Sequence, residues 1–438
     1  MFLIDKITDQ VAIKDDAGNT LTYRQLDEYS KEILQLIGSR NVVLVVCDNS
    51  ISTIAFYYAL MDSDNVPLLL DSRNNVDFIN DYMDLYHPAY IWDDRHEPIK
   101  TSYNRYEVNP ELALIMTTSG STGNPKTVRI SKKNLYENAD AAIDALHLVE
   151  SDRHILTLSM SYSYGLLIVH FSLRCRATLL TTENRVFSSE FGAFLRNEKV
   201  TAIHGVPYIY EMLDRIGIID ALPETIQMIT MGGGRAREAL HKKLNKIVAE
   251  KGLRIYALYG QTEGTCILTK LLDEKTVNVP GCIGVPCRGM KAYISEDNEL
   301  VFTGSSVSLG YAYSWEDLKK TDENKGVLYT GDLARMDEYG QIYLLGRRKR
   351  FIKLLGNRIN LEDIERYVEN EHNLSCVCAG SDEGIIIYLI KGEIKIPLDK
   401  LKICINRRFK ISISLITISE IDEFPRNSQG KIDYKKLR

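Results

Sequence analysis

Short apolar runs followed by amphipathic stretches recur along much of the chain, and this order predicts alternating strands and helices. The run at residues 111–117 predicts a buried strand. Ser131 is then the expected N-cap of a helix that carries Leu135 and Ala142. No solenoid-like repeat or low-complexity block interrupts the order. The pattern therefore indicates an α/β protein with largely parallel sheets.

Three further strand candidates end at polar or glycine-rich turns. Residues 201–204 lead through Gly205-Val-Pro207 into an amphipathic helix, and residues 226–231 lead through three glycines into a helix at 236–250. The strand at 254–258 ends at a polar turn. Ligand-binding loops of such sheets lie at the carboxyl ends of the strands, so these turns are the expected binding loops.

From about Gly304 the pattern changes to short strands separated by turns. The basic cluster at 346–350 then indicates a domain boundary. A strand, a helix at 361–371 and two further strands predict a compact α+β domain of roughly 90 residues, which is a usual domain size. The polar segment at 424–431 is expected to be an exposed loop.

Composition agrees with a globular protein of two domains. The chain has 438 residues, 45% apolar and 26% charged. Its net charge of −5 argues against nucleic-acid binding, which requires clustered positive charge. Residues 348–438 nevertheless hold 18 Lys and Arg against 13 Asp and Glu, so the C-terminal part carries +5 and the remainder −10. A basic module of this kind suits an anionic ligand or an acidic partner.

The ends and the cysteines bear on location. The N-terminus lacks a signal-peptide pattern, and no apolar segment is long enough to insert into a membrane. The eight cysteines have no metal-like spacing, which favours free thiols in a reducing compartment. A cytoplasmic protein is the expectation.

The strongest local motif is Thr117-Thr-Ser-Gly-Ser-Thr-Gly-Asn-Pro-Lys126. Its hydroxyls and two glycines would let backbone N–H groups approach phosphate oxygens closely. It does not follow the Walker pattern, because Lys126 comes three residues after Gly123. The alternative interpretation is a flexible surface turn, against which the preceding strand and the following lysine both argue.

Four further motifs are individually weaker, and each has an ordinary alternative. In Tyr259-Gly-Gln-Thr-Glu263 the hydroxyl and carboxylate could hold a phosphate and Mg²⁺, or Glu263 could be a solvated charge. In Tyr329-Thr-Gly-Asp332, followed by Gly346-Arg347, the aspartate could bind ribose hydroxyls or belong to a Gly-Asp turn. The last two lie at 350–365 and 425–431; in the second, Lys431 could be functional or a solvated lysine.

Together these five segments, in this order, resemble the adenylate-forming superfamily that includes acyl-CoA synthetases, luciferase and peptide-synthetase adenylation domains. Residues 21–27 and 281–286 look like two lesser motifs of the same family. The resemblance implies an N-terminal domain at 1–347 with parallel-rich sheets, flanking helices and a distorted barrel. It also implies a small mobile α+β lid at 348–438.

The resemblance also assigns roles. The ATP phosphates would be held by Thr118, Ser119, Gly120, Ser121, Thr122, Gly123 and Lys126. The adenine and its surroundings would involve Gly232, Gly233, Gly234, Tyr259, Gly260 and Gln261, and the ribose Asp332 and Arg347. Thr262 would hold the α-phosphate, Glu263 would ligate Mg²⁺, Lys349 would be the hinge, and Lys431 would serve adenylation.

The implied activity is attack of a carboxylic acid on ATP to give an acyl-adenylate, followed by transfer to the thiol of coenzyme A or of a phosphopantetheinyl carrier protein. Cations are needed there because both reactants are anionic. The acid pocket would be lined by Tyr162, Tyr164, Gly165, His204, Val206 and Tyr208. For His204, a packed strand-end histidine is the preferred interpretation.

Amino-acid-activating relatives place an aspartate where Tyr162 stands, so a non-amino acyl or aromatic acid is favoured. Two alternatives stay open. One is a ligase that loads an amino acid such as D-alanine onto a carrier protein. For either activity, the basic C-terminal part makes an acidic acyl carrier protein an expected partner. The other is a nucleotide-binding relative without turnover, against which the intact Lys126, Glu263, Asp332 and Lys431 argue.

Overall fold

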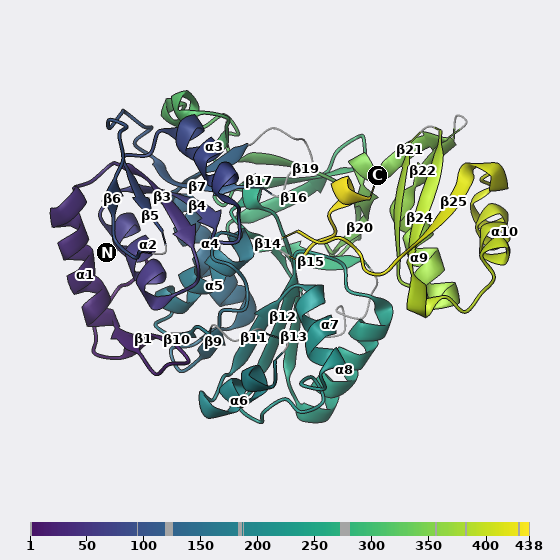
Figure 1. Cartoon of the computed structure of the whole chain (residues 1–438), viewed down its shortest axis with the longest axis horizontal. Helices are drawn as coiled ribbons and strands as arrows, with labels where there is room; N and C mark the ends of the chain where they lie inside the picture. The colour runs from purple at the N-terminus through teal and green to yellow at the C-terminus, as the bar shows by residue number, and fades with distance from the viewer. Residues whose placement is uncertain are drawn as a thin grey trace.

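The fold was determined from a computed structural model of the chain (Figure 1). It describes residues 2–93, 95–118, 126–182, 186, 188–271, 281–354, 357–381, 383–427 and 430–437. Two large sheets and their helices form the N-terminal part, and two small sheets with two helices form the C-terminal part. The expected α/β class is confirmed.

The first sheet has a parallel centre and antiparallel edges. Its seven strands follow the order β18-β8-β7-β4-β3-β5-β6. In that order they span Gly310–Ala312, Thr127–Ser131, Leu112–Thr117, Val66–Asp71, Val42–Cys47, Tyr90–Trp92 and Ile99–Lys100. Strands β5, β3, β4 and β7 are parallel. The predicted strand at 111–117 is β7, which ends beside the expected phosphate motif.

The second sheet combines a parallel and an antiparallel half. Its order is β16-β17-β19-β20-β15-β14-β13-β12-β11-β9-β10-β1-β2. Strands β1, β2, β9, β10, β11, β12 and β13 span, in that order, Val11–Lys14, Thr20–Thr22, Arg153–Ile155, Thr178–Leu180, Ala202–Gly205, Met228–Gly232 and Arg254–Gly260. The antiparallel strands β14, β15, β16, β17, β19 and β20 span Ile267–Lys270, Cys282–Pro286, Met290–Ile294, Glu299–Gly304, Val327–Met336 and Ile342–Arg347. These antiparallel strands continue the same sheet beyond its parallel half.

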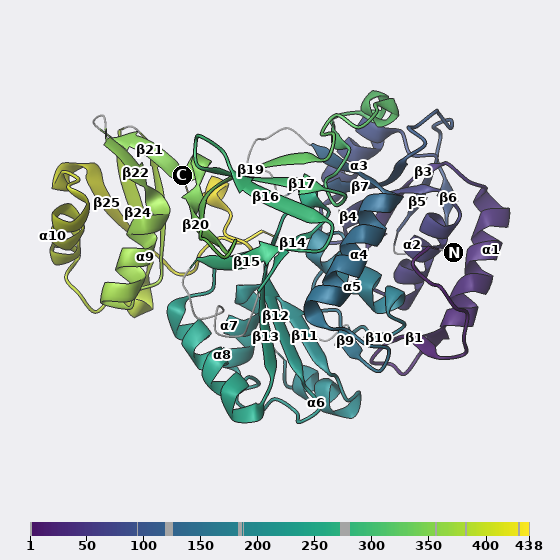
Figure 2. The same cartoon turned by 180° about the vertical axis from the view of Figure 1, so that it is seen from behind.

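Helices cover and connect these sheets (Figures 1 and 2). Helices α1 to α8 span Tyr23–Ile37, Ile51–Asp62, Val76–Tyr86, Lys132–Leu146, Ser163–Arg174, Ser189–Asn197, Pro207–Arg215 and Glu238–Lys251. The main core combines side chains of both sheets with those of α2, α4 and α5. Every residue of α5 from Ser163 to Leu173 is buried, as expected of a helix packed on all sides.

Local signals placed several of these helices correctly. The Ser131 hydroxyl accepts a hydrogen bond from the Asn134 backbone N–H at 3.1 Å, which confirms the predicted N-cap of α4. The helix predicted at 236–250 is α8, which ends at Gly252 with φ +64. Among the described residues, no helix has both the length and the apolar composition required to cross a bilayer.

The C-terminal part has a core of its own. Strands β21 to β25 span Phe351–Leu354, Asn357–Asn360, Cys376–Ser381, Gly384–Ile390 and Ile416–Ile421, and helices α9 and α10 span Leu361–His372 and Leu398–Phe409. One cluster of buried side chains lies entirely within residues 354–416. The domain boundary after residue 347 stays a prediction. The expected helix is α9, whereas α10 and β25 were not predicted.

Candidate functional site

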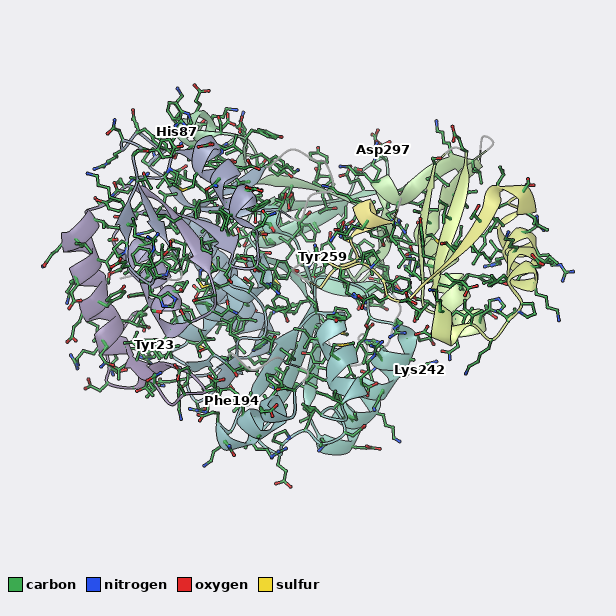
Figure 3. All side chains as sticks on the ribbon, viewed as in Figure 1. Tyr23, His87, Phe194, Lys242, Tyr259 and Asp297 are labelled. Atoms are coloured by element: carbon green, nitrogen blue, oxygen red, sulfur yellow. The ribbon has the colours of Figure 1, made fainter. Side chains whose placement is uncertain are left out.

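The candidate site lies where the binding loops of the second sheet meet the C-terminal segment. The loops after β12 and β13 and the start of α7 all lie at carboxyl ends of parallel strands. Figure 3 labels Tyr259, at the end of β13, between the N-terminal sheets and the segment that leads to the C-terminus. Most of the predicted site residues come together here.

Three glycines permit close packing of these loops. Gly233 has φ +75, and a Cβ there would lie 2.4 Å from the Tyr162 hydroxyl. A Cβ on Gly260 would lie 1.4 Å from the Cys266 carbonyl oxygen, and one on Gly165 would lie 2.1 Å from the Ser159 carbonyl oxygen. By contrast, Gly232 and Gly234 have looser surroundings, with nearest approaches of 3.2 and 3.7 Å. The first three positions therefore require glycine.

The predicted ribose residues form a connected group. The Tyr259 hydroxyl donates a hydrogen bond to Asp332 Oδ2 at 2.7 Å. Arg347 Nε lies 3.5 Å from Asp332 Oδ1, because β19 and β20 pair these two residues directly. Burial raises the pKa of Asp332, and the Arg347 cation opposes that rise. The Tyr259 ring packs against Phe302 with a centroid separation of 6.1 Å.

The phosphate motif is described only at its two ends. Ser119, Gly120, Ser121, Thr122 and Gly123 lie outside the described residues. At one end the buried Thr118 hydroxyl has no hydrogen-bond partner among the described residues, and the same holds for Gln261 Nε2 in the loop after β13. Buried polar atoms without partners indicate groups that a ligand would satisfy. At the other end Lys126 Nζ lies 3.9 Å from the Tyr311 ring centroid.

The turn after β13 presents a hydroxyl and a carboxylate. Thr262 donates a hydrogen bond to the Ser163 hydroxyl at 3.3 Å. Glu263 Oε1 accepts one from the Tyr311 hydroxyl at 2.8 Å. The described residues include no cluster of three metal-ligating side chains. A lone carboxylate still fits Mg²⁺, which commonly binds one or two carboxylates together with water and substrate phosphates.

Lys431 reaches this site from the C-terminal segment. Its ammonium lies 4.8 Å from the Tyr162 ring centroid, and its Cε would lie 3.5 Å from a Cβ on Gly233. Burial and, to a smaller extent, the Arg347 cation lower the pKa of Lys431 to about 8, against opposing contributions from Cys266 and Glu263. The expectation that 424–431 forms an exposed loop was wrong here, because Lys431 is half-buried.

Contacts with α7 hold the Lys431 segment in place. The Arg426 guanidinium lies 4.4 Å from the Tyr208 ring centroid and 3.5 Å from Glu211, and donates a hydrogen bond to the Gly430 carbonyl at 2.8 Å. A Cβ on Gly430 would lie 3.4 Å from side-chain atoms of both Val206 and Tyr208. The predicted pocket residues Val206 and Tyr208 therefore also support the segment that carries Lys431.

Behind Tyr162 lies a buried polar network. The Tyr164 and Thr230 hydroxyls are 2.5 Å apart, Thr230 lies 2.7 Å from His204 Nδ1, and His204 Nε2 lies 3.0 Å from His154. Burial lowers the pKa of His204, so the imidazole is neutral. His204 is thus a packed strand residue that would act on a bound acid only through Thr230 and Tyr164.

The predicted hinge residue lies between the two parts. Lys349 is exposed in a single 3₁₀ turn, Arg348–Arg350, that connects β20 to β21. Its role stays a prediction.

Sequence reasoning missed Tyr311, Ser163, Cys266 and Arg426. Each contacts or electrostatically influences a predicted site residue that is distant in the chain. The polar run around Arg426 was noted, but nothing in it indicated Glu211 as partner. Only the fold brings these pairs together.

Comparison with known proteins gives a consistent result. A model of the AMP-binding enzyme family matches residues 88–312, which is more than half of the chain. The chain is 26% identical to 2-succinylbenzoate–CoA ligase of Bacillus pumilus (strain SAFR-032), covering 78% of this chain and 71% of that protein. It is 25% identical to L-proline–[L-prolyl-carrier protein] ligase of Streptomyces coelicolor, covering 75% of this chain and 66% of that protein.

The fold also matches a solved structure. The crystal structure of ATP-bound MatB from Rhodopseudomonas palustris has a TM-score of 0.83 and 19% identity, and the match covers 100% of this chain and 97% of that one. At this level of identity the similarity shows a shared fold.

Proposed function

Because this chain belongs to the AMP-binding enzyme family of adenylate-forming acid–thiol ligases, we propose that it activates a carboxylic acid with ATP and transfers the acyl group to a thiol. The first half-reaction forms an acyl-adenylate and releases pyrophosphate. The second forms a thioester and releases AMP.

The position of Lys431 is the observation that carries this proposal. Its ammonium lies against the Tyr162 ring on the acid side. On the nucleotide side, the charges of Glu263 and Arg347 both affect its pKa. No carboxylate forms an ion pair with it in the described part of the chain. A desolvated cation without a direct ion pair at this point would stabilise the negative charge that develops when two anions react.

The chemistry follows from that placement. A carboxylate oxygen attacks the α-phosphorus of ATP, and the bond from that phosphorus to the pyrophosphate oxygen breaks. The Lys431 ammonium would reduce the repulsion between carboxylate and phosphate. The thiolate of the acceptor then attacks the acyl carbon, and AMP leaves with the electron pair of the acyl–oxygen bond.

The nucleotide would be held by the groups around β13. Asp332 would accept hydrogen bonds from ribose hydroxyls, and the orphaned Thr118 hydroxyl and Gln261 amide are available for the phosphates and the base. Glu263 would ligate Mg²⁺, which supplies positive charge between the phosphates. The similarity to ATP-bound MatB in fold agrees with this assignment.

An acid without an α-amino group fits the pocket best. Tyr162 stands where amino-acid-activating relatives place an aspartate, and it is buried beside Gly233. The carboxylate of Glu211, on the neighbouring helix α7, is already paired with Arg237 at 3.2 Å and Arg426 at 3.5 Å. A substrate ammonium would therefore lack a free counterion there. The CoA-ligase relative, which acts on succinylbenzoate, is consistent with this class.

The acceptor is proposed to be a phosphopantetheine thiol, carried by coenzyme A or by a carrier protein. Both carriers are anionic, and the C-terminal residues 348–438 carry a net charge of +5. Because Lys431 occupies the site in this arrangement, the C-terminal part would have to rotate about Lys349 before a thiol could enter.

An aminoacyl-carrier ligase is the second candidate. The relative that loads L-proline onto a carrier protein favours it, because that enzyme matches three quarters of this chain. It would require a group other than a carboxylate near Tyr162 to hold the amine.

ATP–pyrophosphate exchange with a panel of carboxylic acids tests the proposal. The panel should contain aliphatic, aromatic, dicarboxylic and amino acids, with hydroxylamine trapping to detect each acyl-adenylate. We expect exchange with at least one acid that has no amino group. Coenzyme A and a holo carrier protein are then added separately to the best acid, and thioester formation identifies the acceptor.

The outcomes separate the candidates. Exchange with amino acids alone would replace the proposal with the aminoacyl-carrier ligase. ATP binding without exchange for any acid would indicate a nucleotide-binding relative without turnover.

A further inference from the structure

Tyr311 lies between two predicted nucleotide-binding residues of opposite charge. Its hydroxyl donates a hydrogen bond to Glu263 Oε1 at 2.8 Å, and its ring face receives the Lys126 ammonium at 3.9 Å from the centroid. No direct ion pair joins Lys126 to Glu263 among the described residues. One side chain thus contacts both the residue expected to bind Mg²⁺ and the lysine of the phosphate motif.

The strand that carries Tyr311 is fixed beside the phosphate motif. In the antiparallel pair of β18 and β8, Tyr311 lies opposite Val128, two residues after Lys126. The fully buried Arg129 donates hydrogen bonds to the Leu309 and Tyr311 carbonyls, both at 3.1 Å. These bonds to the backbone on each side of Gly310 leave β18 little freedom to shift.

The segment before β18 also holds the turn that contains Glu263. The Ser308 backbone N–H donates to the Glu263 carbonyl at 2.9 Å, and the Thr265 hydroxyl donates to the Ser306 carbonyl at 2.7 Å. Residues 306–311 therefore fix both the backbone of Glu263 and one of its carboxylate oxygens.

From this arrangement we propose that Tyr311 is a positioning residue that keeps Glu263 and Lys126 apart and oriented for magnesium and nucleotide. This inference rests on the proposed function. If Lys126 paired directly with Glu263, each would neutralise the other and neither would face the phosphates. Tyr311 contacts both Glu263 and Lys126, and each contact is weaker than a direct ion pair would be. Because its hydrogen bond at Oε1 orients the Glu263 carboxylate, Oε2 is left for Mg²⁺.

The chain offers a matched control in Tyr343. Its hydroxyl donates to Asp337 Oδ2 at 3.0 Å, and the Arg335 guanidinium lies 3.9 Å from its ring centroid. Tyr343 has the same two contacts as Tyr311, but its partners Arg335 and Asp337 include no predicted site residue. Tyr343→Phe and Tyr343→Leu therefore remove equivalent interactions without touching the nucleotide site.

Equilibrium binding of ATP, measured by calorimetry on the full chain across a range of Mg²⁺ concentrations, tests the proposal. Tyr311→Phe keeps the ring and removes the hydroxyl, so the Mg²⁺ concentration for half-maximal enhancement of binding should rise on the order of 10-fold. ATP affinity without Mg²⁺ should be unchanged. Tyr311→Leu should also weaken Mg²⁺-free ATP binding, by roughly two- to fivefold, because the Lys126 ammonium loses its cation–π interaction with the Tyr311 ring.

Thermal unfolding of each variant separates positioning from folding, since Tyr311→Phe should unfold near the wild-type temperature. The proposal would be overturned if Tyr311→Phe had the wild-type dependence on Mg²⁺. It would also be overturned if Tyr343→Phe shifted that dependence as much as Tyr311→Phe does. Wild-type protein that binds ATP with Mg²⁺ but exchanges pyrophosphate with no acid would overturn the proposed function alone. The two failures are therefore distinguishable.

Discussion

Lys431 lies in a segment whose composition predicts an exposed loop, but its side chain occupies a confined position. The residues around it are polar and turn-forming, yet its ammonium is half-buried against Tyr162 and Gly233. Burial, with a smaller contribution from Arg347, lowers the pKa of Lys431 to about 8. A lysine whose pKa is about 8 gains or loses its charge within the pH range in which enzymes usually act.

We predict that Lys431→Ala abolishes adenylation but leaves ATP binding nearly unchanged. In the wild type, Lys431 is protonated below its pKa and loses its charge as pH rises through about 8. The value of kcat/KM for the acid should therefore fall about tenfold per pH unit above 8. ATP–pyrophosphate exchange rates between pH 6 and 10 measure this decline.

Lys435→Ala serves as the control for that experiment. Lys435 is four residues further along the same segment and is exposed, so its loss should change neither the rate nor the pH profile. Equal losses of ATP binding and adenylation in Lys431→Ala would contradict the assigned role.

At the scale of elements, the glycine loop after β12 connects the sheet to the acid side of the site. Gly233→Ala should lower the free energy of unfolding by about 1–2 kcal/mol, because φ +75 is unfavourable for alanine. It should also reduce adenylation at least about tenfold, since the new Cβ would displace the Tyr162 hydroxyl on which the geometry at Lys431 depends. Urea unfolding and pyrophosphate exchange measure the two effects.

Gly252→Ala isolates the backbone effect. Gly252 ends α8 with φ +64 and has open space where a Cβ would lie. It should lose similar stability and keep full adenylation. If Gly233→Ala retained wild-type activity, Tyr162 would not be positioned by this loop.

Sequence patterns predicted those elements whose signals are local. Ser131 was identified as an N-cap because its hydroxyl bonds to a residue only three positions away. Strand β25 and helix α10 were missed, because short apolar runs such as 416–421 do not show whether they pair with another strand. Here β25 adds to β24 in parallel, with α10 in the connection.

The site was predictable as a set of motifs, whereas its contacts were not. The glycine, phosphate and Lys431 segments each have recognisable composition. Tyr311 and Glu263, however, are 48 residues apart, and no local feature indicates that they share a hydrogen bond. The place of Lys431 likewise depends on Tyr162 and Gly233, which are far away in the sequence.

At the scale of the whole molecule, the C-terminal part lies beside the N-terminal part (Figure 2), and ion pairs join the two. Arg237 lies 3.9 Å from Glu393 and donates a hydrogen bond to the Ser375 hydroxyl at 2.5 Å. Arg235 lies 3.5 Å from Glu369 of α9. Partly exposed pairs of this kind contribute at most about 1 kcal/mol each and weaken with salt. Weak pairs of this kind suit an interface that, under the proposed function, would close for adenylation and open for thioester formation.

Arg237→Ala should therefore slow adenylation by roughly two- to fivefold, because the closed arrangement loses up to about 1 kcal/mol. It should leave thioester formation unchanged or faster, since the same contacts must break before the thiol enters. Lys243→Ala, which removes ion pairs to Asp214 and Asp220 within the N-terminal part, is the matched control. Single-turnover assays of each half-reaction at low and high ionic strength measure the effect; equal slowing of both half-reactions would show that Arg237 supports the fold and not the closed arrangement.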